Sequence, residues 1–126
     1  MRILFVEDSE SVVNQMKDIL NETHHQLTTA KDGTEGLGEL AIGEIDIVIA
    51  DLHMPRMDGL TMLEFYDHLR SHNIKKVMLT TEINPELVEK GKRLGVIAWL
   101  TKPLRKNNII GTLEKIEKDL GEKEEN

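Results

Sequence analysis

Polar residues that could carry out chemistry follow short apolar runs of the sequence, at the point where each run ends. They are two acids after the first run, one acid after the third, a threonine after the fourth and a lysine after the fifth: Glu7, Asp8, Asp51, Thr80 and Lys102. Carboxylates held close together are unfavourable unless a cation lies among them. Clustered hard oxygen ligands suit Mg²⁺, which often bridges carboxylates to a phosphoryl group. With a lysine and a hydroxyl nearby, such a cluster contains the groups needed to transfer a phosphoryl group to a carboxylate.

Each of these residues also has a purely structural interpretation. A Glu-Asp pair after a strand is usually a solvated turn, and Lys102 before Pro103 is typical of an exposed strand end. Thr80 suits a strand by its propensity. Asp51 is harder to explain in this way, because it ends a strongly apolar run and a buried acid needs a partner. The joint placement of these residues therefore favours a common site more than any one of them does.

Short strands that alternate with helices must position these residues. Runs rich in β-branched residues predict strands at residues 3–6, 27–30, 45–50, 77–79 and 97–100. Apolar stripes at helical spacing predict helices at residues 12–20, 33–40, 60–69, 85–94 and 109–120. This alternation predicts βαβ crossovers and hence a parallel sheet covered by helices on both faces. Ligands of such sheets bind beyond the carboxyl ends of the strands, where the polar residues above are expected.

Local signals refine two of the predicted helices. Asn84 can cap the first turn of the fourth helix, Pro85 fits its first position, and Gly95 is suited to its end. In the second helix, Gly36 and Gly38 each cost roughly 1 kcal/mol of helix propensity relative to Ala. We therefore expect the second helix to be the least rigid of the five.

The composition bounds the class of protein. The chain has 126 residues, enough for one domain, and only 3% aromatic residues, so its core must be aliphatic. The net charge of −7 disfavours binding to nucleic acid, which requires clustered Lys and Arg. The sequence contains no cysteine, which excludes disulfides, thiolate zinc sites and cysteine nucleophiles. It has no membrane-length apolar run and no signal-peptide pattern, so we expect a soluble cytoplasmic protein that does not bind membranes.

The sequence resembles the receiver domain of bacterial two-component response regulators over essentially its whole length. The matching motifs follow the first, third, fourth and fifth predicted strands: Glu7-Asp8, residues 51–59 (DLHMPRMDG), Thr80 and Lys102-Pro103. Other residues resemble the chemotaxis (CheY-type) branch of the family: residues 79–82, residues 90–92, Gly95 and Trp99. The resemblance implies a receiver domain at residues 1–120, followed by a polar tail at residues 121–126 that we expect to be frayed. The implied fold is α/β and flavodoxin-like, with a doubly wound five-stranded parallel sheet in the order 2-1-3-4-5 and five helices.

The resemblance also implies a role for each residue of the site. Asp51 would be the phosphoacceptor, taking the phosphoryl group from a sensor histidine kinase, a phosphotransfer protein or a small phosphodonor. Mg²⁺, or Mn²⁺ in its place, would bind to the side chains of Asp8 and Asp51 and to the main-chain carbonyl of His53. Glu7 would contribute directly or through water. Lys102 would pair with the phosphoryl oxygens.

A conformational switch is implied by the same resemblance. Thr80 would donate its hydroxyl to the phosphoryl group, and Trp99 would be the switch aromatic that turns inward when the threonine moves. These movements would change the surface formed by the fourth helix, fifth strand and fifth helix, through which a downstream target protein is bound. His53, Thr81 and Glu82 flank the site, and we predict that they tune the lifetime of the phosphoryl group.

The implied protein is a signalling switch that catalyses only its own phosphorylation and dephosphorylation. It would be a monomer or weak dimer without an organic cofactor, either free-standing or a receiver module of a longer regulator. The Lys102-Pro103 bond would be cis. An alternative of another class is a Mg²⁺-dependent aspartate-nucleophile phosphatase, but such enzymes carry a second Asp where this chain has His53. A nucleotide carrier of the same architecture is disfavoured, because the acids after the first strand repel phosphate.

The remaining histidines carry less information. His24 and His25 are adjacent and are expected in the turn before the second strand. His68 and His72 have the i, i+4 spacing of a metal-binding pair on a helix, but the sequence indicates no third ligand. We therefore expect these two histidines to lie at an exposed helix end.

Overall fold

The computed structural model describes the backbone of residues 1–69 and 74–125 and the side chains of residues 1–69 and 74–121. His72 of the predicted His68/His72 pair lies outside the described residues. Five parallel strands form one sheet in the order β2-β1-β3-β4-β5, which confirms the expected topology. The strands have the following bounds: β1 (Arg2–Val6), β2 (Gln26–Ala30), β3 (Ile47–Asp51), β4 (Lys75–Thr80) and β5 (Val96–Thr101).

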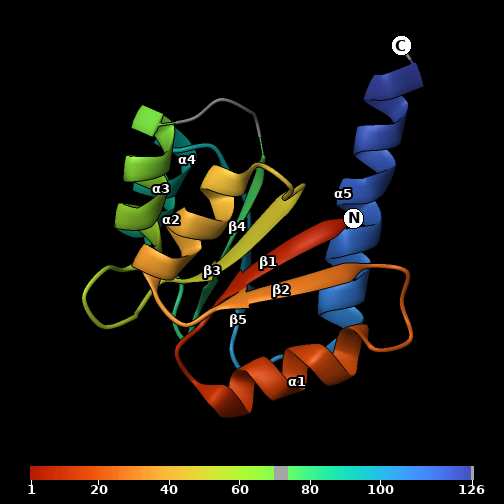
Figure 1. Cartoon of the computed structure of the whole chain (residues 1–126), viewed down its shortest axis with the longest axis horizontal. Coiled ribbons are helices and arrows are strands. Elements are labelled where there is room, and N and C mark those ends of the chain that lie inside the picture. Colours follow the sequence, from red (N-terminus) through yellow and green to blue (C-terminus); the bar gives the residue numbers. More distant parts are fainter. Residues whose placement is uncertain (70–73, 126) are drawn as a thin grey trace.

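Helices cover both faces of the sheet, as the alternation of elements predicts (Figure 1). Two of them lie on one face: α1 (Glu10–Leu20) and α5 (Lys106–Glu125). The other three lie on the opposite face: α2 (Gly33–Ile42), α3 (Gly59–Leu69) and α4 (Pro85–Arg93). The fold is therefore the doubly wound, flavodoxin-like α/β architecture that the sequence indicates.

The core forms two layers because successive side chains of a strand point to opposite faces. In β1, Ile3 and Phe5 pack beneath α1 and α5, whereas Leu4 and Val6 pack beneath the other three helices. All of the residues of the central strand β3 are buried, as expected for a parallel strand covered on both sides. The buried side chains are mainly Ile, Leu, Val and Met, which agrees with the low aromatic content.

The helix ends agree with their local signals. The Asn84 side chain accepts hydrogen bonds from the backbone N–H groups of Glu86 and Leu87 and so caps α4. Gly95 follows the end of α4 with a φ of 86°, in the left-handed region that favours glycine. In α2, a Cβ on Gly36 would lie only 2.7 Å from the Met62 sulfur, so this glycine permits α2 to lie close to α3.

Most element boundaries lie one or two residues from the expected ranges, and two of the differences bear on the interpretation. β3 begins at Ile47 and ends at Asp51, so the acid is the last residue of the strand instead of following it. α5 continues to Glu125, whereas we expected a frayed tail from residue 121. The apolar stripe ends near Leu120, but Glu and Lys are strong helix formers and extend the backbone helix beyond that stripe.

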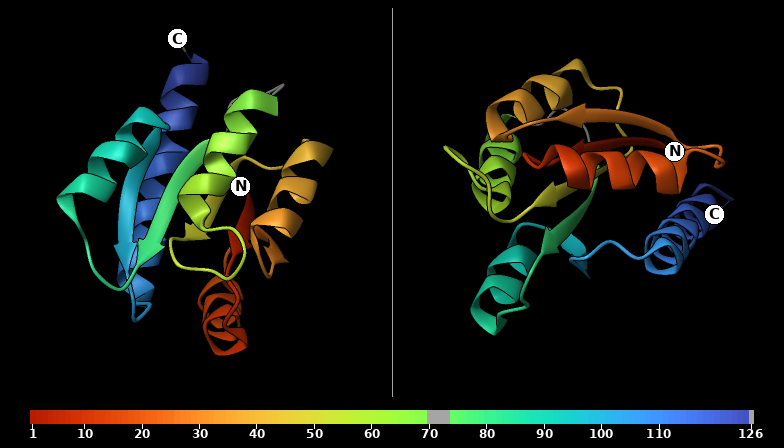
Figure 2. Two further views of the ribbon diagram at one scale, coloured as in Figure 1. Left: turned by 90° about the vertical axis from the view of Figure 1, so that its left-hand side faces the viewer. Right: turned by 90° about the horizontal axis from the view of Figure 1, so that it is seen from below.

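The sheet register brings the carboxyl ends of the strands to one edge (Figure 2). Val6 pairs with Ala50, Asp51 with Leu79, and Thr80 with Thr101. The next residues along β1 and β5 are therefore Glu7 and Lys102, both at this edge.

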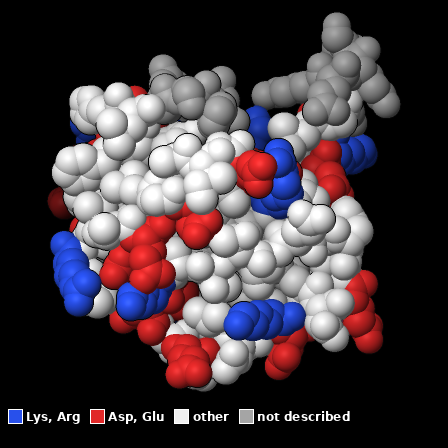
Figure 3. All heavy atoms as spheres, in the orientation of Figure 1, with Lys and Arg blue, Asp and Glu red and all other residues white. Residues whose placement is uncertain are grey.

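Figure 3 shows the charged side chains on one face of the molecule. On the face drawn in Figure 3, the coloured Lys and Arg side chains are scattered among acidic ones and do not gather into a basic patch. Within the described part of the chain, every helix is too short or too polar to cross a membrane.

Candidate functional site

The Lys102 ammonium group lies between two buried carboxylates at the carboxyl edge of the sheet. Its Nζ atom is 2.8 Å from Asp51 Oδ2 and 2.8 Å from Glu7 Oε1. It donates a hydrogen bond to the Asp51 oxygen. These residues come from the ends of β1, β3 and β5, so the central contact joins positions 51 residues apart in the sequence.

Backbone hydrogen bonds fix these side chains at the strand ends. The Glu7 N–H donates to the Ala30 carbonyl (2.9 Å), which extends the β1–β2 pairing beyond β1. The Lys102 N–H donates to the Thr80 carbonyl (2.9 Å), which extends the β4–β5 pairing in the same way. The bond between Lys102 and Pro103 is cis, which confirms that expectation.

The pocket buries more negative than positive charge. Glu7 and Asp51 are 1% and 2% exposed, whereas Asp8 beside them is exposed. Burial raises the pKa of Glu7 to about 7, although the adjacent Lys102 ammonium group and the hydrogen bond from the Ser9 N–H oppose this effect. Burial alone lowers the pKa of Lys102, but the hydrogen bond to Asp51 and the ion pair with Glu7 outweigh it, and the pKa is raised. A further cation is therefore favourable in this pocket.

The donor atoms of the pocket fit a hard divalent cation. Glu7, Asp8 and Asp51 each offer a carboxylate oxygen, and these three atoms lie within 4.8 Å of one another. Glu7 Oε1 is buried and makes no hydrogen bond of good geometry within the described chain, although Lys102 Nζ lies close to it. An oxygen-only donor set with an incompletely satisfied carboxylate is suited to Mg²⁺ or Mn²⁺.

The other predicted metal ligand, His53, is adjacent to the acceptor carboxylate. Its backbone N–H donates to Asp51 Oδ1 at 3.1 Å, and its side chain is exposed. The loop from β3 to α3 thus begins with a turn held by the Asp51 side chain. The role of the His53 carbonyl as a ligand stays a prediction.

Thr80 is fully buried, and its hydroxyl is used within the loop that follows β4. Its Oγ1 donates to the Glu82 carbonyl (3.0 Å) and accepts from the Glu82 N–H (3.2 Å). Thr81 and the Glu82 side chain are exposed at the mouth of this loop. In the described structure the Thr80 hydroxyl is therefore bonded to its own loop and not to the acidic pocket.

Trp99 is half-buried and packs against the core beneath α2, α3 and α4. Its ring lies against Gly91 of α4, where a Cβ would be 2.7 Å from Trp99 Cζ2. The absence of a side chain at position 91 therefore makes room for this large aromatic ring. The sequence reasoning noted both Trp99 and residues 90–92 but not the contact between Trp99 and Gly91, since only the fold brings them together.

Gly59 is a second glycine whose role the sequence reasoning missed. A Cβ at this position would lie 2.6 Å from the Asp51 carbonyl oxygen, closer than real Cβ atoms approach a backbone oxygen. Only glycine allows the start of α3 to lie directly against the end of β3. The motif containing Gly59 marks it in the sequence, but its contact with Asp51 requires the fold.

Comparison with known proteins identifies the family. Residues 3–114 match the sequence model of the response regulator receiver domain. The chain belongs to this family. It is 33% identical to the chemotaxis protein CheY of Treponema pallidum over 112 residues, covering 86% of this chain and 77% of that protein. The predicted likeness to the CheY-type branch is thereby confirmed.

Solved structures agree with this assignment. The receiver superposes on chemotaxis protein CheY4 of Vibrio cholerae with a TM-score of 0.83 and 30% identity, covering 90% of this chain and 96% of that one. It superposes equally well, with a TM-score of 0.83 and 29% identity, on a CheY-like receiver domain protein of Methanospirillum hungatei. That match covers 98% of this chain and 96% of the other.

Receiver domains also occur within much longer proteins. The chain is 28% identical over 116 residues to the sensory/regulatory protein RpfC of Xanthomonas campestris and spans only 16% of its length. The receiver is a signalling domain of two-component systems, not a classical enzyme. Family membership therefore disfavours the phosphatase interpretation.

Proposed function

We propose that this receiver accepts one phosphoryl group on the Asp51 carboxylate. The observation that carries the proposal is the position of Lys102 Nζ, 2.8 Å from Asp51 Oδ2, within a buried acidic pocket. In the reaction, a carboxylate oxygen of Asp51 forms a bond to phosphorus while the bond to the donor's leaving group breaks. The leaving group is the imidazole of a phosphohistidine on a sensor kinase or phosphotransfer protein, or the carboxylate of acetyl phosphate.

Lys102 supports this transfer by electrostatics. Its ammonium group neutralises the charge of the incoming phosphoryl oxygens without itself gaining or losing a proton. At about 4 Å and an effective dielectric constant near 20, one such pair is worth on the order of 4 kcal/mol before desolvation. The positive charge of Lys102 is therefore already positioned beside Asp51 before the phosphodonor binds.

The acids of the pocket would hold Mg²⁺, with Mn²⁺ as a substitute. Asp8 and Asp51 supply side-chain oxygens, Glu7 contributes directly or through water, and the His53 carbonyl supplies a further oxygen. When bound, the ion neutralises the charge that develops on the transferred group. The close approach of three carboxylate oxygens supports this assignment.

The same site would control a surface through Thr80. After phosphorylation, its hydroxyl leaves the Glu82 carbonyl and donates to a phosphoryl oxygen. The loop after β4 then moves, and Trp99 turns inward from its position against Gly91. Coupling of about 1–3 kcal/mol between the site and the α4-β5-α5 surface suffices to bias binding of a target protein.

Three exposed residues would set the lifetime of the phosphorylated state. His53, Thr81 and Glu82 border the approach of the hydrolytic water to Asp51. We expect a different dephosphorylation rate in a His53→Ala, Glu82→Ala double variant, and an unchanged rate would show that these residues do not set the lifetime.

The proposed partners are a cytoplasmic histidine kinase or phosphotransfer protein and a target protein, consistent with the CheY relatives. The proposal concerns residues 1–120 and holds for a free-standing receiver and for a module of a longer chain.

The test is phosphorylation by acetyl phosphate in the presence of Mg²⁺, followed by intact mass and by the fluorescence of Trp99. We expect one phosphoryl group per chain and a change in fluorescence, both abolished in Asp51→Asn. Asp58→Asn is the matched control, because Asp58 is a neighbouring acid that caps α3 and Asn is an equally good cap. A mass gain that persists in Asp51→Asn would overturn the assignment. Continuous turnover of acetyl phosphate without accumulation would favour the phosphatase class instead.

A further inference from the structure

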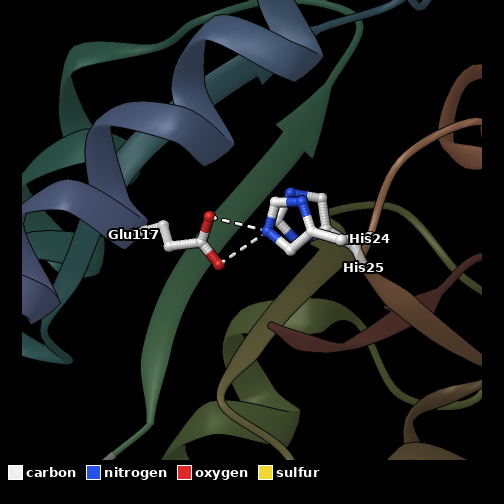
Figure 4. Close-up of side chains that lie close together, drawn as sticks. All are labelled: His24, His25 and Glu117. Atoms are coloured by element: carbon white, nitrogen blue, oxygen red, sulfur yellow. Dashed lines mark hydrogen bonds and ion pairs between the residues drawn. The ribbon is translucent and has the colours of Figure 1, made fainter.

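Two histidines and a glutamate converge at the end of the molecule near the N-terminus, away from the acidic pocket (Figure 4). His24 Nε2 lies 2.8 Å from Glu117 Oε1 and 2.9 Å from Oε2. The His25 ring lies beside the His24 ring, with 4.2 Å between the ring centroids. One nitrogen of each imidazole and one Glu117 oxygen all lie within 4.8 Å of one another.

The three side chains come from two elements that are distant in the sequence. His24 and His25 occupy the turn between α1 and β2, which confirms their expected place, and Glu117 lies 93 positions after His24 on α5. The cluster therefore forms only when α5 packs beside this turn. The Met1 amine is also nearby, 2.9 Å from His25 Nδ1 and 3.3 Å from Glu117 Oε2.

An ion pair between His24 and Glu117 does not by itself explain the second imidazole. Glu117 is paired with His24, and the His25 ring lies beside that pair and contacts the Met1 amine through Nδ1. A neutral imidazole offers a lone pair, which is the form that binds metals, and the second ring places two such nitrogens beside one carboxylate.

We propose that His24, His25 and Glu117 bind one Zn²⁺ ion and thereby join the α1–β2 turn to α5. Two imidazole nitrogens and one carboxylate oxygen are a known ligand set for Zn²⁺, with a fourth position open to water. The donor chemistry separates this site from the acidic pocket, since imidazole nitrogen prefers Zn²⁺ and an oxygen-only set prefers Mg²⁺. The chain has no cysteine to compete for the ion.

Accessibility allows the ion to enter. The side chains of His24 and Glu117 are 66% and 37% exposed, so binding needs no opening of the core. Because the ligands lie on the turn and on α5, binding would restrain α5 against the body of the domain. The proposal is independent of phosphorylation at Asp51.

The experiment is a titration of untagged, metal-free protein with Zn²⁺ by calorimetry, in excess Mg²⁺ to saturate the acidic pocket. Co²⁺ serves as a spectroscopic probe, because its visible absorption increases strongly at tetrahedral sites. We expect one Zn²⁺ per chain and a tetrahedral Co²⁺ spectrum. Binding should weaken as the pH falls through the usual imidazole range, because protons compete for the ligands.

Single variants identify the ligands. We expect His24→Ala, His25→Ala and Glu117→Gln each to weaken Zn²⁺ binding by more than the roughly 10- to 100-fold that loss of an outer partner typically costs. His68→Ala and Glu114→Gln are the matched controls, a histidine on α3 and an acid one turn from Glu117, and both should retain wild-type affinity. The ligand variants should give the same far-ultraviolet circular dichroism spectrum as the wild type, which shows that they are folded.

Two results would overturn the proposal. One is the absence of a Zn²⁺-dependent heat and of a tetrahedral Co²⁺ spectrum in the wild type. The other is undiminished binding in the His24→Ala and Glu117→Gln variants. If His25→Ala does not fold, histidine ring signals of the wild type decide the matter, since Zn²⁺ must shift those of His24 and His25 before that of His68.

Discussion

Two lysines at opposite ends of the neighbouring strands β4 and β5 differ in the charge that surrounds them. At the start of β4, Lys76 Nζ lies 2.7 Å from Asp67 Oδ1 and donates to the Leu94 carbonyl at 2.7 Å. After the end of β5, Lys102 Nζ contacts two buried carboxylates at once. Lys76 faces one unit of opposite charge and a neutral acceptor, whereas Lys102 is outnumbered by acids.

The difference lies in the balance of charge, not in the quality of the contacts. Lys76 joins β4, α3 and the end of α4, and its charge is matched where it lies. The pocket around Lys102 contains a third acid, Asp8, and a buried oxygen of Glu7 that lacks a good hydrogen bond in the described chain. This excess of acids favours a further cation in the pocket.

The largest effect is expected from Lys102→Ala. Removal of this charge should slow phosphorylation by acetyl phosphate on the order of 100-fold, comparable to the loss of one preorganised donor at a catalytic site. The measurement is the rate of mass gain in the presence of Mg²⁺. Lys76→Met is the control for lysine loss in general, and it should leave that rate unchanged. Equal rates in Lys102→Ala and the wild type would show that the pocket does not use this charge.

Lys76→Met should lower the stability of the fold and leave the rate of phosphorylation unchanged. The change leaves the Leu94 carbonyl and the Asp67 carboxylate without their donor, which should lower the free energy of unfolding by about 1–3 kcal/mol. Urea denaturation measures this loss. A variant as stable as the wild type would mean that solvent replaces the ammonium group at no cost.

Glu7→Gln should raise the stability of the metal-free protein. Burial raises the pKa of Glu7 from 4.5 to about 7, so the folded chain binds this proton more tightly than the unfolded chain. The stability that Glu7 contributes is therefore present below the unfolded pKa and lost as the pH rises through about 7. At mildly alkaline pH the variant should gain on the order of 1 kcal/mol, because one pKa unit corresponds to about 1.4 kcal/mol.

Denaturation of both proteins across this pH range, without Mg²⁺, tests the Glu7 prediction. The advantage of Glu7→Gln should disappear at acid pH and should shrink when Mg²⁺ is added. A variant that is less stable than the wild type at alkaline pH would show that the contact with Lys102 outweighs the cost of burial.

The smallest effect on stability is expected from Gly91→Ala. A Cβ at this position would lie 2.7 Å from Trp99 Cζ2 and must displace the ring. The cost of crowding, about 1–3 kcal/mol, is partly offset by roughly 1 kcal/mol of helix propensity. We expect a clear shift in Trp99 emission with little loss of stability. Gly111→Ala in α5 is the control, because a Cβ there meets nothing within 4 Å, and it should leave the emission unchanged.

Much of the fold was predictable from sequence because its signals are local. Alternating apolar runs locate the strands, and the Asn84, Pro85 and Gly95 signals mark the ends of α4. In a parallel sheet the carboxyl ends of the strands lie at the same side. The polar residues at those ends, Glu7 and Asp51 among them, were therefore expected to lie close together. The functional roles of these residues stay predictions until phosphorylation is measured.

The remaining features depend on contacts that no local pattern encodes. Glu117 meets His24 only through the packing of α5, and Gly91 meets Trp99 only across the α4–β5 interface. The hydrogen bonds between Thr80 and Glu82 depend on the conformation of the loop after β4, which residue types alone do not specify. The extension of α5 to Glu125 was missed because the prediction followed the apolar stripe. That stripe shows which residues pack against the sheet, not how far the helical backbone continues.

The most direct test of the account is to locate the phosphoryl group chemically. After treatment with acetyl phosphate and Mg²⁺, borohydride reduces an aspartyl phosphate to homoserine, which peptide mass spectrometry assigns to one position. We predict homoserine at position 51 alone. Homoserine at position 8 or 58, with Asp51 unmodified, would contradict the central claim. That claim is that the phosphoacceptor is the carboxylate that is hydrogen-bonded to Lys102.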